Sequence, residues 1–298
     1  MRGDEIAATV QRWSKMVNDA LDQLLPPERE VPVALHRAMR YAVLQGGGRI
    51  RPVLVLAAAS LGDAPEGAAV VGACALELVH AYSLVHDDLP CMDDSDYRRG
   101  LPSCHRAFGE GMAVLAGTAL LSLSFQLCAK QLVERGISPQ RALGVLVELG
   151  RACGSRGVMG GQALDLQARG RPVSADMMEL MHRLKTARLF EAAVVIGAEL
   201  GGLDEGARAA LREYGHRLGM GYQTLDDLED WREEAPGEEP NLRALYSEEQ
   251  CWDRARSWME QAAERARTLG KGAEFLVTFP LWLYRRARAR RGEPSGAV

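Results

Sequence analysis

Hydrophobic and polar residues follow the period of an α-helix along most of this chain. Strong helix formers, namely Ala, Leu, Arg and Glu, fill most windows of the sequence. No run of alternating β-branched and aromatic residues bounded by turn residues occurs, so strands are not expected. The pattern therefore predicts an all-α protein.

Proline, glycine and polar capping residues divide this pattern into separate helices. Pro90 interrupts the helix that begins near Gly67, and Ser174 is a candidate N-cap for a later helix. The polar segment 233–240 contains a glycine and two prolines and is expected to be a loop. About ten helices result, and no change in composition marks a domain boundary. We expect one domain over residues 1–298, built as a single large helical bundle.

One segment is apolar enough to raise the question of a membrane span. Residues 111–129 carry no charge and are long enough to cross a bilayer. However, the segment contains several small or polar residues, Lys130 follows it directly, and no aromatic belt flanks it. We therefore expect a buried core helix and no membrane span.

The charge and the cysteine pattern exclude several classes of protein. The formal net charge is -4, whereas a nucleic-acid-binding domain is normally basic, so no nucleic-acid partner is expected. The six cysteines form no C-x-x-C pair and no secretory signal sequence is recognisable, so we expect reduced thiols in a cytoplasmic protein. No cluster has the ligand spacing of a zinc site.

The first of two acidic clusters directly follows the apolar run 73–85. It consists of Asp87, Asp88, Asp93, Asp94 and Asp96. Burying several carboxylates together is costly, because like charges resist joint ionisation. Asp87 and Asp88 also stand at the C-terminal end of a predicted helix, where the helix dipole disfavours anions. A hard divalent cation removes this cost, and oxygen ligands suit magnesium.

The second cluster lies in the segment GYQTLDDLEDWREE and consists of Asp226, Asp227 and Asp230. On a helix, Asp226 and Asp230 lie on one face, Asp227 is adjacent, and Gln223 lies one turn earlier on that face. A solvated, acidic helix end is the alternative for either cluster alone. Two clusters of the same D-D-x(n)-D form, each after an apolar helical stretch, instead favour a shared function.

Two facing carboxylate clusters indicate a phosphate-bearing substrate between them. Magnesium usually binds one or two protein carboxylates and completes its coordination with water and substrate phosphate oxygens. Metal ions held in this way would neutralise a departing diphosphate group.

The longest motif adds a family resemblance to this interpretation. The segment HAYSLVHDDLPCMDDSDYRRGLPSCH, residues 80–105, resembles the first Asp-rich region of trans-prenyl diphosphate synthases, namely the farnesyl and geranylgeranyl diphosphate synthases of the bacterial and plastid type. Further similar segments stand in the family's order: GGGRIRP at 46–52, GGQALDL at 160–166, HRLKTARLF at 182–190 and YQTLDDLED at 222–230. The resemblance covers roughly residues 35–230. It implies the isoprenoid synthase fold, a helical bundle around a central cavity.

The resemblance also implies which residues bind metal and which bind the allylic substrate. The implied ligands are Asp87, Asp88 and Asp93 for two magnesium ions, and Asp226, Asp227 and Asp230 for a third. Arg98 would contact the allylic diphosphate, and Lys185, Thr186 and Gln223 would line the allylic site. Lys185 would touch the leaving diphosphate, and the Thr186 region would stabilise the allylic cation.

The family reaction proceeds by ionisation, condensation and elimination. The carbon–oxygen bond of the allylic diphosphate breaks, the alkene of isopentenyl diphosphate attacks the cation, and a proton leaves. Arg51, His80 and Arg99 would bind the diphosphate of isopentenyl diphosphate, since arginine binds phosphate oxygens in a fork. The resemblance further implies a homodimer.

Tyr82 is the candidate for the residue that limits product length. It lies five residues before Asp87, slightly more than one helical turn below the metal-binding end. A bulky aromatic side chain there should block elongation, so the resemblance favours farnesyl diphosphate as the product. An ordinary core aromatic residue is the alternative.

The chain departs from the family pattern in three places. Gly48 replaces the lysine of the family's GGKRxRP motif that binds isopentenyl diphosphate, and the adjacent Arg49 should point elsewhere. Thr118 replaces the aspartate of the family's GDALL segment. The segment after the second cluster, EEAPGEEPNLRALYSEEQ, contains no lysine, and its nearest cations are Arg232 and Arg243. A basic tail either closes the site or is solvated: Arg285, Arg286, Arg288, Arg290 and Arg291.

These departures leave several functions open. The first is a magnesium-dependent short-chain prenyl diphosphate synthase that condenses isopentenyl diphosphate with an allylic diphosphate. The second is a terpene cyclase or diphosphate lyase that ionises an allylic diphosphate without condensing it. The third is a non-catalytic partner subunit of a heteromeric prenyl synthase, and the fourth is a structural or metal-binding bundle without a substrate.

Overall fold

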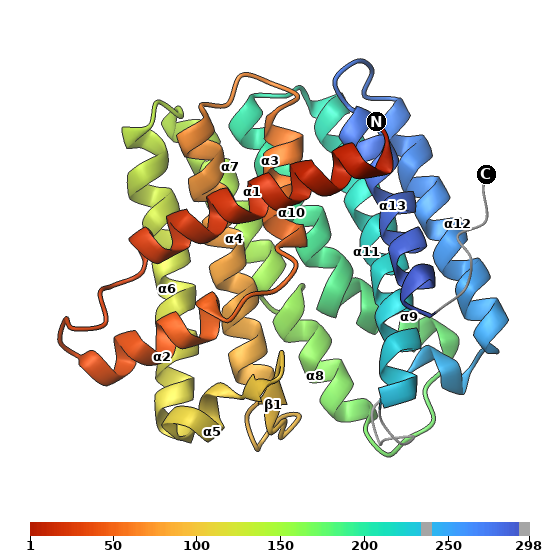
Figure 1. Cartoon of the computed structure of the whole chain (residues 1–298), viewed down its shortest axis with the longest axis horizontal. Coiled ribbons are helices and arrows are strands. Elements are labelled where there is room, and N and C mark those ends of the chain that lie inside the picture. The colour runs from red at the N-terminus through yellow and green to blue at the C-terminus, as the bar shows by residue number, and fades with distance from the viewer. Residues whose placement is uncertain (234–239, 292–298) are drawn as a thin grey trace.

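The computed structural model describes residues 1–233 and 240–291, and helices dominate them (Figure 1). The helices of the first half are α1 (Gly3–Leu24), α2 (Val33–Leu44), α3 (Ile50–Ala59), α4 (Glu66–Asp87), α5 (Cys104–Phe108), α6 (Glu110–Glu134) and α7 (Pro139–Cys153). Those of the second half are α8 (Val158–Ala168), α9 (Ala175–His182), α10 (Arg188–Gly201), α11 (Glu205–Glu233), α12 (Glu248–Arg267) and α13 (Glu274–Arg290). The prediction of an all-α protein is confirmed.

Two short helical segments of other types occur between these α-helices. The π-helical segment η1 (Arg183–Ala187) joins α9 to α10, and the 3-10 helix η2 (Leu242–Ala244) precedes α12. The loop predicted for residues 233–240 lies almost wholly outside the described residues.

Helices α4 and α10 form the centre of the bundle. Most residues of α4 and almost all of α10 are buried, because α3, α6, α7 and α11 pack against one or both of them. Figure 1 shows these two helices in the middle, with α6 on one side, α11 to α13 on the other, and α1 crossing the bundle. A Cβ atom at Gly197 would lie 2.4 Å from the carbonyl oxygen of Val55, so glycine lets α10 and α3 approach backbone to backbone.

The predicted breaks coincide with observed helix ends. Helix α4 ends at Asp87, shortly before Pro90. Ser174 caps α9, where its hydroxyl oxygen accepts a hydrogen bond from the backbone N–H of Met177 at 3.3 Å. The end of α4 matters for function, because it fixes where the first acidic cluster begins.

Helix α6 is less buried than the sequence pattern predicts. By length and composition, α4 and α6 could each cross a membrane. In α4, 83% of the apolar window is buried inside the protein, whereas in α6 only 39% is buried. Helices α2, α4, α5 and α7 cover one side of α6, whereas Val114, Leu115 and Val133 are exposed. The expectation of a buried core helix at 111–129 is therefore wrong for its outer face. Uncharged residues all around a helix do not tell whether neighbours cover every side of it.

A short hairpin interrupts the helices after α4. Strands β1 (Tyr97–Arg98) and β2 (Leu101–Pro102) pair antiparallel, with Arg98 opposite Leu101. The turn residues Arg99 and Gly100 both have positive φ, 54° and 77°, as two-residue hairpin turns of the mirror-image type require. The sequence pattern does not predict these strands, because two residues show no alternation. The turn sends Arg98 and Arg99, which are neighbours in sequence, to different partners.

Candidate active site

A cavity of about 300 Å³ lies between the C-terminal half of α4, the hairpin, η1 and α11. Its polar lining residues are Arg51 of α3, His80, Ser83 and Asp87 of α4, Arg98 and Arg99 of the hairpin, Lys185 and Thr186 of η1, and Tyr222 and Asp226 of α11. Each acidic cluster therefore contributes one carboxylate to the same cavity: Asp87 from the first and Asp226 from the second.

The chain after α4 folds back over the end of that helix. The backbone N–H of Asp93 donates to the carbonyl of Asp87 at 2.8 Å, and that of Ser95 donates to the carbonyl of Asp88 at 3.2 Å. These bonds satisfy carbonyls that a helix end leaves free. They also explain why the first cluster has residues between its aspartates, because the intervening turn brings Asp93 back beside Asp87.

Asp87 is the member of the first cluster that faces the cavity. No hydrogen bond or ion pair engages its carboxylate in the described part of the chain. Burial raises the pKa of Asp87 to about 7, with Asp93 and Asp88 adding to the rise and Lys185 and Arg98 opposing it. A nearby cation would stabilise the ionised form of this buried carboxylate.

Asp88 and Asp93 each have a guanidinium partner instead. Asp88 accepts from Arg98 Nη2 at 2.5 Å and from Arg98 Nε at 3.1 Å. Asp93 accepts from Gln162 Nε2 at 3.0 Å and forms an ion pair with Arg169. Neither carboxylate lines the cavity, so their predicted role as metal ligands stays a prediction.

The second cluster divides in a similar way. Asp226 lines the cavity, and burial raises its pKa well above the ordinary value, with Asp230 and Asp227 adding to the rise and Arg51 opposing it. Asp227 points to the other side, where it accepts from Gln223 Nε2 at 2.7 Å and from the backbone N–H of Leu242 at 2.8 Å. Asp230 is exposed. The metal role predicted for Asp227 and Asp230 also stays a prediction.

The basic lining residues split into two groups. Arg51 Nη1 lies 3.2 Å from His80 Nε2, and its guanidinium lies 4.9 Å from the ring centroid of Phe190. Burial and the nearby arginines hold the pKa of His80 well below its ordinary value, so this imidazole is neutral at pH 7. Arg99 donates to the carbonyl of Gly46. The family resemblance implies this group as the binding site of the second diphosphate, and that role stays a prediction.

The other basic group is built on η1. Lys185 pairs with the buried Asp165 of α8, and the Thr186 hydroxyl donates to the Gln223 amide oxygen. A π-turn adds a residue to a helix and often occurs at functional sites. Here it separates α9 from α10 and carries both Lys185 and Thr186 at the cavity wall.

Sequence reasoning missed three residues that organise the site: Gln162, Asp165 and Arg169. Gln162 and Asp165 belong to the GGQALDL segment, so the resemblance offered a signal for them. Arg169 lies beyond every quoted motif, and no sequence signal identifies it. The prediction that Arg49 points elsewhere is confirmed. Arg49 is buried, and it donates to Glu77, to the carbonyl of Val43 at 2.6 Å and to Asn18 Oδ1 at 2.8 Å.

Tyr82 does not line the cavity; its neighbour Ser83 does. The Tyr82 ring is 4% exposed and packs edge-on against His86, with ring centroids 5.1 Å apart. Tyr82 therefore lies behind the cavity wall, one turn from Asp87.

The lining residues fit a hard divalent cation such as magnesium. Asp87 and Asp226 offer carboxylate oxygens, carry raised pKa values and engage no cation of the described residues directly. Among the described residues, no group of three or more His, Cys, Asp or Glu side chains gathers closely enough to hold an ion. Magnesium usually binds only one or two protein carboxylates and keeps several waters.

The match to known proteins decides the family. The chain matches the Polyprenyl synthetase family over residues 32–238. It belongs to that family. The matched region contains both acidic clusters and the GGGRIRP segment, and it ends before α12 and α13.

Two curated relatives and one solved structure illustrate the similarity. The heterodimeric geranylgeranyl pyrophosphate synthase large subunit 1 of Arabidopsis thaliana (chloroplastic) is 42% identical over 220 residues, 73% of this chain and 59% of that protein. The geranylfarnesyl diphosphate synthase of Leucosceptrum canum (chloroplastic) is 45% identical over 217 residues, 72% of this chain and 58% of that protein. The chain thus spans just under three fifths of the length of these two relatives.

The solved structure of an FPP/GFPP synthase from Zymomonas mobilis is similar over the whole fold. Its TM-score is 0.87 at 30% sequence identity, and the match covers 95% of this chain and 100% of that one. The predicted isoprenoid synthase fold is therefore confirmed.

Proposed function

We propose that this chain is a magnesium-dependent short-chain trans-prenyl diphosphate synthase that condenses isopentenyl diphosphate with an allylic diphosphate. The observation that carries the proposal is the shared cavity. There, one carboxylate from each acidic cluster faces four cationic side chains, Arg51, Arg98, Arg99 and Lys185. A diphosphate substrate needs both metal-binding carboxylates and phosphate-binding cations. Membership of the polyprenyl synthetase family supports the same reaction.

The allylic diphosphate would lie between Asp87 and Asp226. Magnesium bound there would neutralise the leaving diphosphate. Arg98 and Lys185 would donate hydrogen bonds to its oxygens, since each has more N–H groups than Asp88 and Asp165 engage. The carbon–oxygen bond would then break inside a cavity whose charges are already in place.

Thr186 and Gln223 are oriented to stabilise the resulting cation. The Gln223 amide nitrogen donates to Asp227 at 2.7 Å, so its carbonyl oxygen points back to the Thr186 hydroxyl. This arrangement holds two oxygen dipoles beside the cavity wall. Asp227 would therefore act by positioning Gln223, whereas Asp226 would act at the metal.

Isopentenyl diphosphate would bind to Arg51, His80 and Arg99. Its alkene carbon would attack the allylic cation, which forms the new carbon–carbon bond. The proton lost in the elimination step would pass to the departed diphosphate. The neutral His80 contributes a hydrogen bond but no charge.

We propose farnesyl diphosphate as the main product. A growing chain that passes Ser83 would meet Tyr82 and His86, whose rings pack against each other behind the wall. Two relatives are named for geranylgeranyl and geranylfarnesyl products, so longer products are the alternative outcome of the product assay.

We also propose a homodimer that forms through α6. Val114, Leu115 and Val133 of this helix are 43%, 56% and 44% exposed, and a second copy would cover them. One relative is named as the large subunit of a heterodimeric synthase, so a heteromer is the alternative. Light scattering on the purified chain should give twice the chain mass, and a monomer would contradict the proposal.

The main test is product analysis of the purified chain. It is incubated with magnesium and each allylic diphosphate, with and without isopentenyl diphosphate, and products are identified by mass spectrometry. An elongated diphosphate should form only when both substrates are present. Hydrocarbon or alcohol from the allylic diphosphate alone would favour a cyclase or lyase. Folded, magnesium-loaded protein that forms no product at all would reject the proposed function.

A further inference from the structure

The cavity end proposed for isopentenyl diphosphate depends on the placement of two cations. Gly48 stands where the family motif has a lysine, and the neutral His80 adds no charge. Of the described residues, Arg51 and Arg99 would therefore supply the positive charge for a multiply charged diphosphate. Hydrogen bonds from arginine to phosphate oxygens require a defined geometry, so the positions of these two groups should decide the affinity.

Residues 46–49 form a tight turn before α3. The backbone φ is 92° at Gly46 and 111° at Gly47, and it is 47° at Arg49, the N-cap residue of α3. Glycine adopts such values readily, whereas a residue with a Cβ atom rarely does. The left-handed conformation of Arg49 therefore needs contacts that hold it in place.

The Arg49 side chain makes these contacts in the protein core. Its guanidinium donates to the carboxylate of Glu77 on α4, to the carbonyl of Val43 on α2 at 2.6 Å and to Asn18 Oδ1 on α1 at 2.8 Å. The side chains of Arg49 and Glu77 are only 1% and 3% exposed. One guanidinium thus ties the start of α3 to three other helices.

Such a buried ion pair is better suited to fixing an orientation than to stabilising the fold. Both charges lose their hydration on burial, and apolar side chains of similar volume often give equal stability. A planar guanidinium with acceptors on three helices, however, satisfies all of them in one orientation.

The turn supports the guanidinium of Arg99 directly. The carbonyl of Gly46 accepts a hydrogen bond from Arg99, and a Cβ atom at position 47 would lie 2.6 Å from the Arg99 guanidinium. The glycine at position 47 thus lets this guanidinium lie against the backbone of the turn.

The same turn sets the position of Arg51, which lies in the first turn of α3. Helix α4 contacts both arginines of this segment, because Glu77 and His80 are three residues apart and share a face. Glu77 pairs with Arg49, and His80 Nε2 lies 3.2 Å from Arg51 Nη1. Both guanidinium groups of the condensing end therefore depend on the turn that Arg49 holds.

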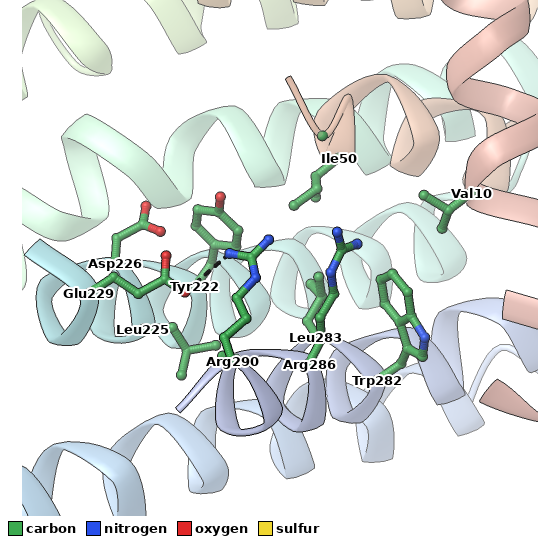
Figure 2. Close-up of a pocket in the computed structure, with 12 residues that line it drawn as sticks. Val10, Ile50, Tyr222, Leu225, Asp226, Glu229, Trp282, Leu283, Arg286 and Arg290 are labelled. Carbon is green, nitrogen blue, oxygen red and sulfur yellow. Dashed lines mark hydrogen bonds and ion pairs between the residues drawn. The ribbon is translucent and has the colours of Figure 1, made fainter. Parts of the chain in front are cut away.

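The neighbours of Arg49 face a second cavity, of about 170 Å³ (Figure 2). Gly48 and Ile50 line it from the start of α3, and Arg286 and Arg290 line it from α13. Figure 2 shows Ile50 on the side opposite α13, from which both guanidinium groups extend. A turn that loses the conformation of Arg49 would redirect these neighbours as well.

We infer that the buried ion pair of Arg49 and Glu77 positions the two guanidinium groups that would bind isopentenyl diphosphate. Both are positioning residues, since neither lines the central cavity. The inference rests on the proposed function and adds no ligand to its condensing end.

Four variants of the full chain test the inference: Arg49→Met, Arg49→Lys, Arg49→Met combined with Glu77→Met, and Arg212→Met. The double variant removes both charges together, so no unpaired charge stays buried and the chain should fold. Arg212 is the matched control, because it pairs with the buried Glu148 at 2.8 Å and 2.9 Å, and neither residue lines the central or the second cavity.

Three measurements are made on each variant. Calorimetry gives the Kd of isopentenyl diphosphate without turnover. Steady-state assays give kcat and the KM of each substrate, and thermal unfolding gives the stability.

Arg49→Met and the double variant should each raise Kd and KM for isopentenyl diphosphate about tenfold, the effect of one lost charge-assisted hydrogen bond. The values of kcat and of KM for the allylic substrate should stay within about threefold. The double variant should melt at a higher temperature than Arg49→Met and yet bind no better. Arg49→Lys keeps the ion pair and should retain most of the affinity. Arg212→Met should lower the melting temperature and leave both KM values unchanged.

Several results would overturn the inference. If the wild type condenses both substrates and the double variant binds isopentenyl diphosphate as tightly, the ion pair only stabilises the fold and the proposed function stands. Equal increases in both KM values would show a general effect, as would Arg212→Met or Arg49→Lys binding as weakly as Arg49→Met. If the wild type neither binds nor condenses isopentenyl diphosphate, the inference and the proposed function both fail.

Discussion

The two ends of the central cavity hold their charges differently. At the allylic end, most charged side chains already have a partner of opposite sign: Asp88 with Arg98, Asp93 with Arg169, and Lys185 with Asp165. Asp87 and Asp226 are the two exceptions among the described acidic residues that line the cavity. Binding of metal and diphosphate at this end would therefore exchange existing partners and engage two carboxylates that have none.

The condensing end contains cations without counter-ions. Arg51 and Arg99 have no carboxylate within ion-pair distance in the described part of the chain. Arg51 instead contacts His80 and Phe190, and Arg99 contacts the carbonyl of Gly46. An end with uncompensated positive charge attracts an anion directly, so affinity there should depend on the number of cations. Under the proposed function, one end would serve metal-assisted bond breaking and the other would serve binding alone.

The largest expected effect concerns Asp87. Asp87→Asn should lower kcat at least about a thousandfold, because it removes a carboxylate that would hold the magnesium ion that neutralises the leaving diphosphate. Asp94→Asn is the matched control, since Asp94 lies in the same motif, is 57% exposed and pairs with Arg106 at 3.6 Å. Its kcat should stay within about threefold. Equal losses in the two variants would contradict the assignment of Asp87.

The next largest effect should show that the two ends bind different substrates. It is measured as KM in variants of two residues that are neighbours in sequence. Arg98→Ala should raise KM for the allylic diphosphate, and Arg99→Ala should raise KM for isopentenyl diphosphate, each roughly 10- to 100-fold. The hairpin turn sends these two side chains to Asp88 and Gly46 respectively, so each should affect one substrate. If both variants raise both KM values alike, the two ends do not bind separate diphosphates.

A smaller effect distinguishes the two adjacent aspartates of α11. Asp226→Asn should abolish most activity and leave the melting temperature unchanged or higher, since its buried carboxylate has a raised pKa. Asp227→Asn should lower stability by roughly 1–3 kcal/mol, because an amide cannot accept from both Gln223 and the Leu242 N–H as the carboxylate does. Calorimetry together with the activity assay measures both. A destabilised Asp226→Asn with normal activity would reverse these roles.

The smallest effect is a pH dependence of stability without metal. The pKa of Asp87 rises from 3.8 to about 7 on folding, so the folded state holds this proton more tightly than the unfolded state. Ionisation of Asp87 therefore destabilises the folded state. This destabilisation is absent below pH 4, grows as the pH rises to 7 and is constant at higher pH. Asp87→Asn removes it and should therefore be more stable than the wild type at pH 8, by at most about 4 kcal/mol. Thermal unfolding in chelator checks this, and a pH-independent difference would contradict it.

The elements and the pairing of the two acidic clusters could be predicted from the sequence, because both depend on local patterns. Helix periodicity, Pro90 and Ser174 fix helix boundaries through contacts within one turn. The spacing of the aspartates likewise identifies Asp87 and Asp226 as candidates for one site. These predictions concern residues that are close in sequence or that carry a strong motif.

The partners of the charged residues could not be predicted in the same way. Arg169 pairs with Asp93 across 76 positions, and Arg286 and Gly48 line one cavity only because α13 packs beside α3. Such contacts depend on how distant helices pack, which no spacing rule describes. The outer face of α6 was mispredicted for a related reason, because the sequence does not tell which side of an apolar helix the rest of the chain covers.

The most direct test of the shared site is a crystal structure with manganese and a non-ionisable allylic diphosphate analogue. The account predicts anomalous peaks at Asp87 and at Asp226, bridged by one diphosphate group. A diphosphate bound at only one of the two carboxylates, or metal bound outside the cavity, would contradict it.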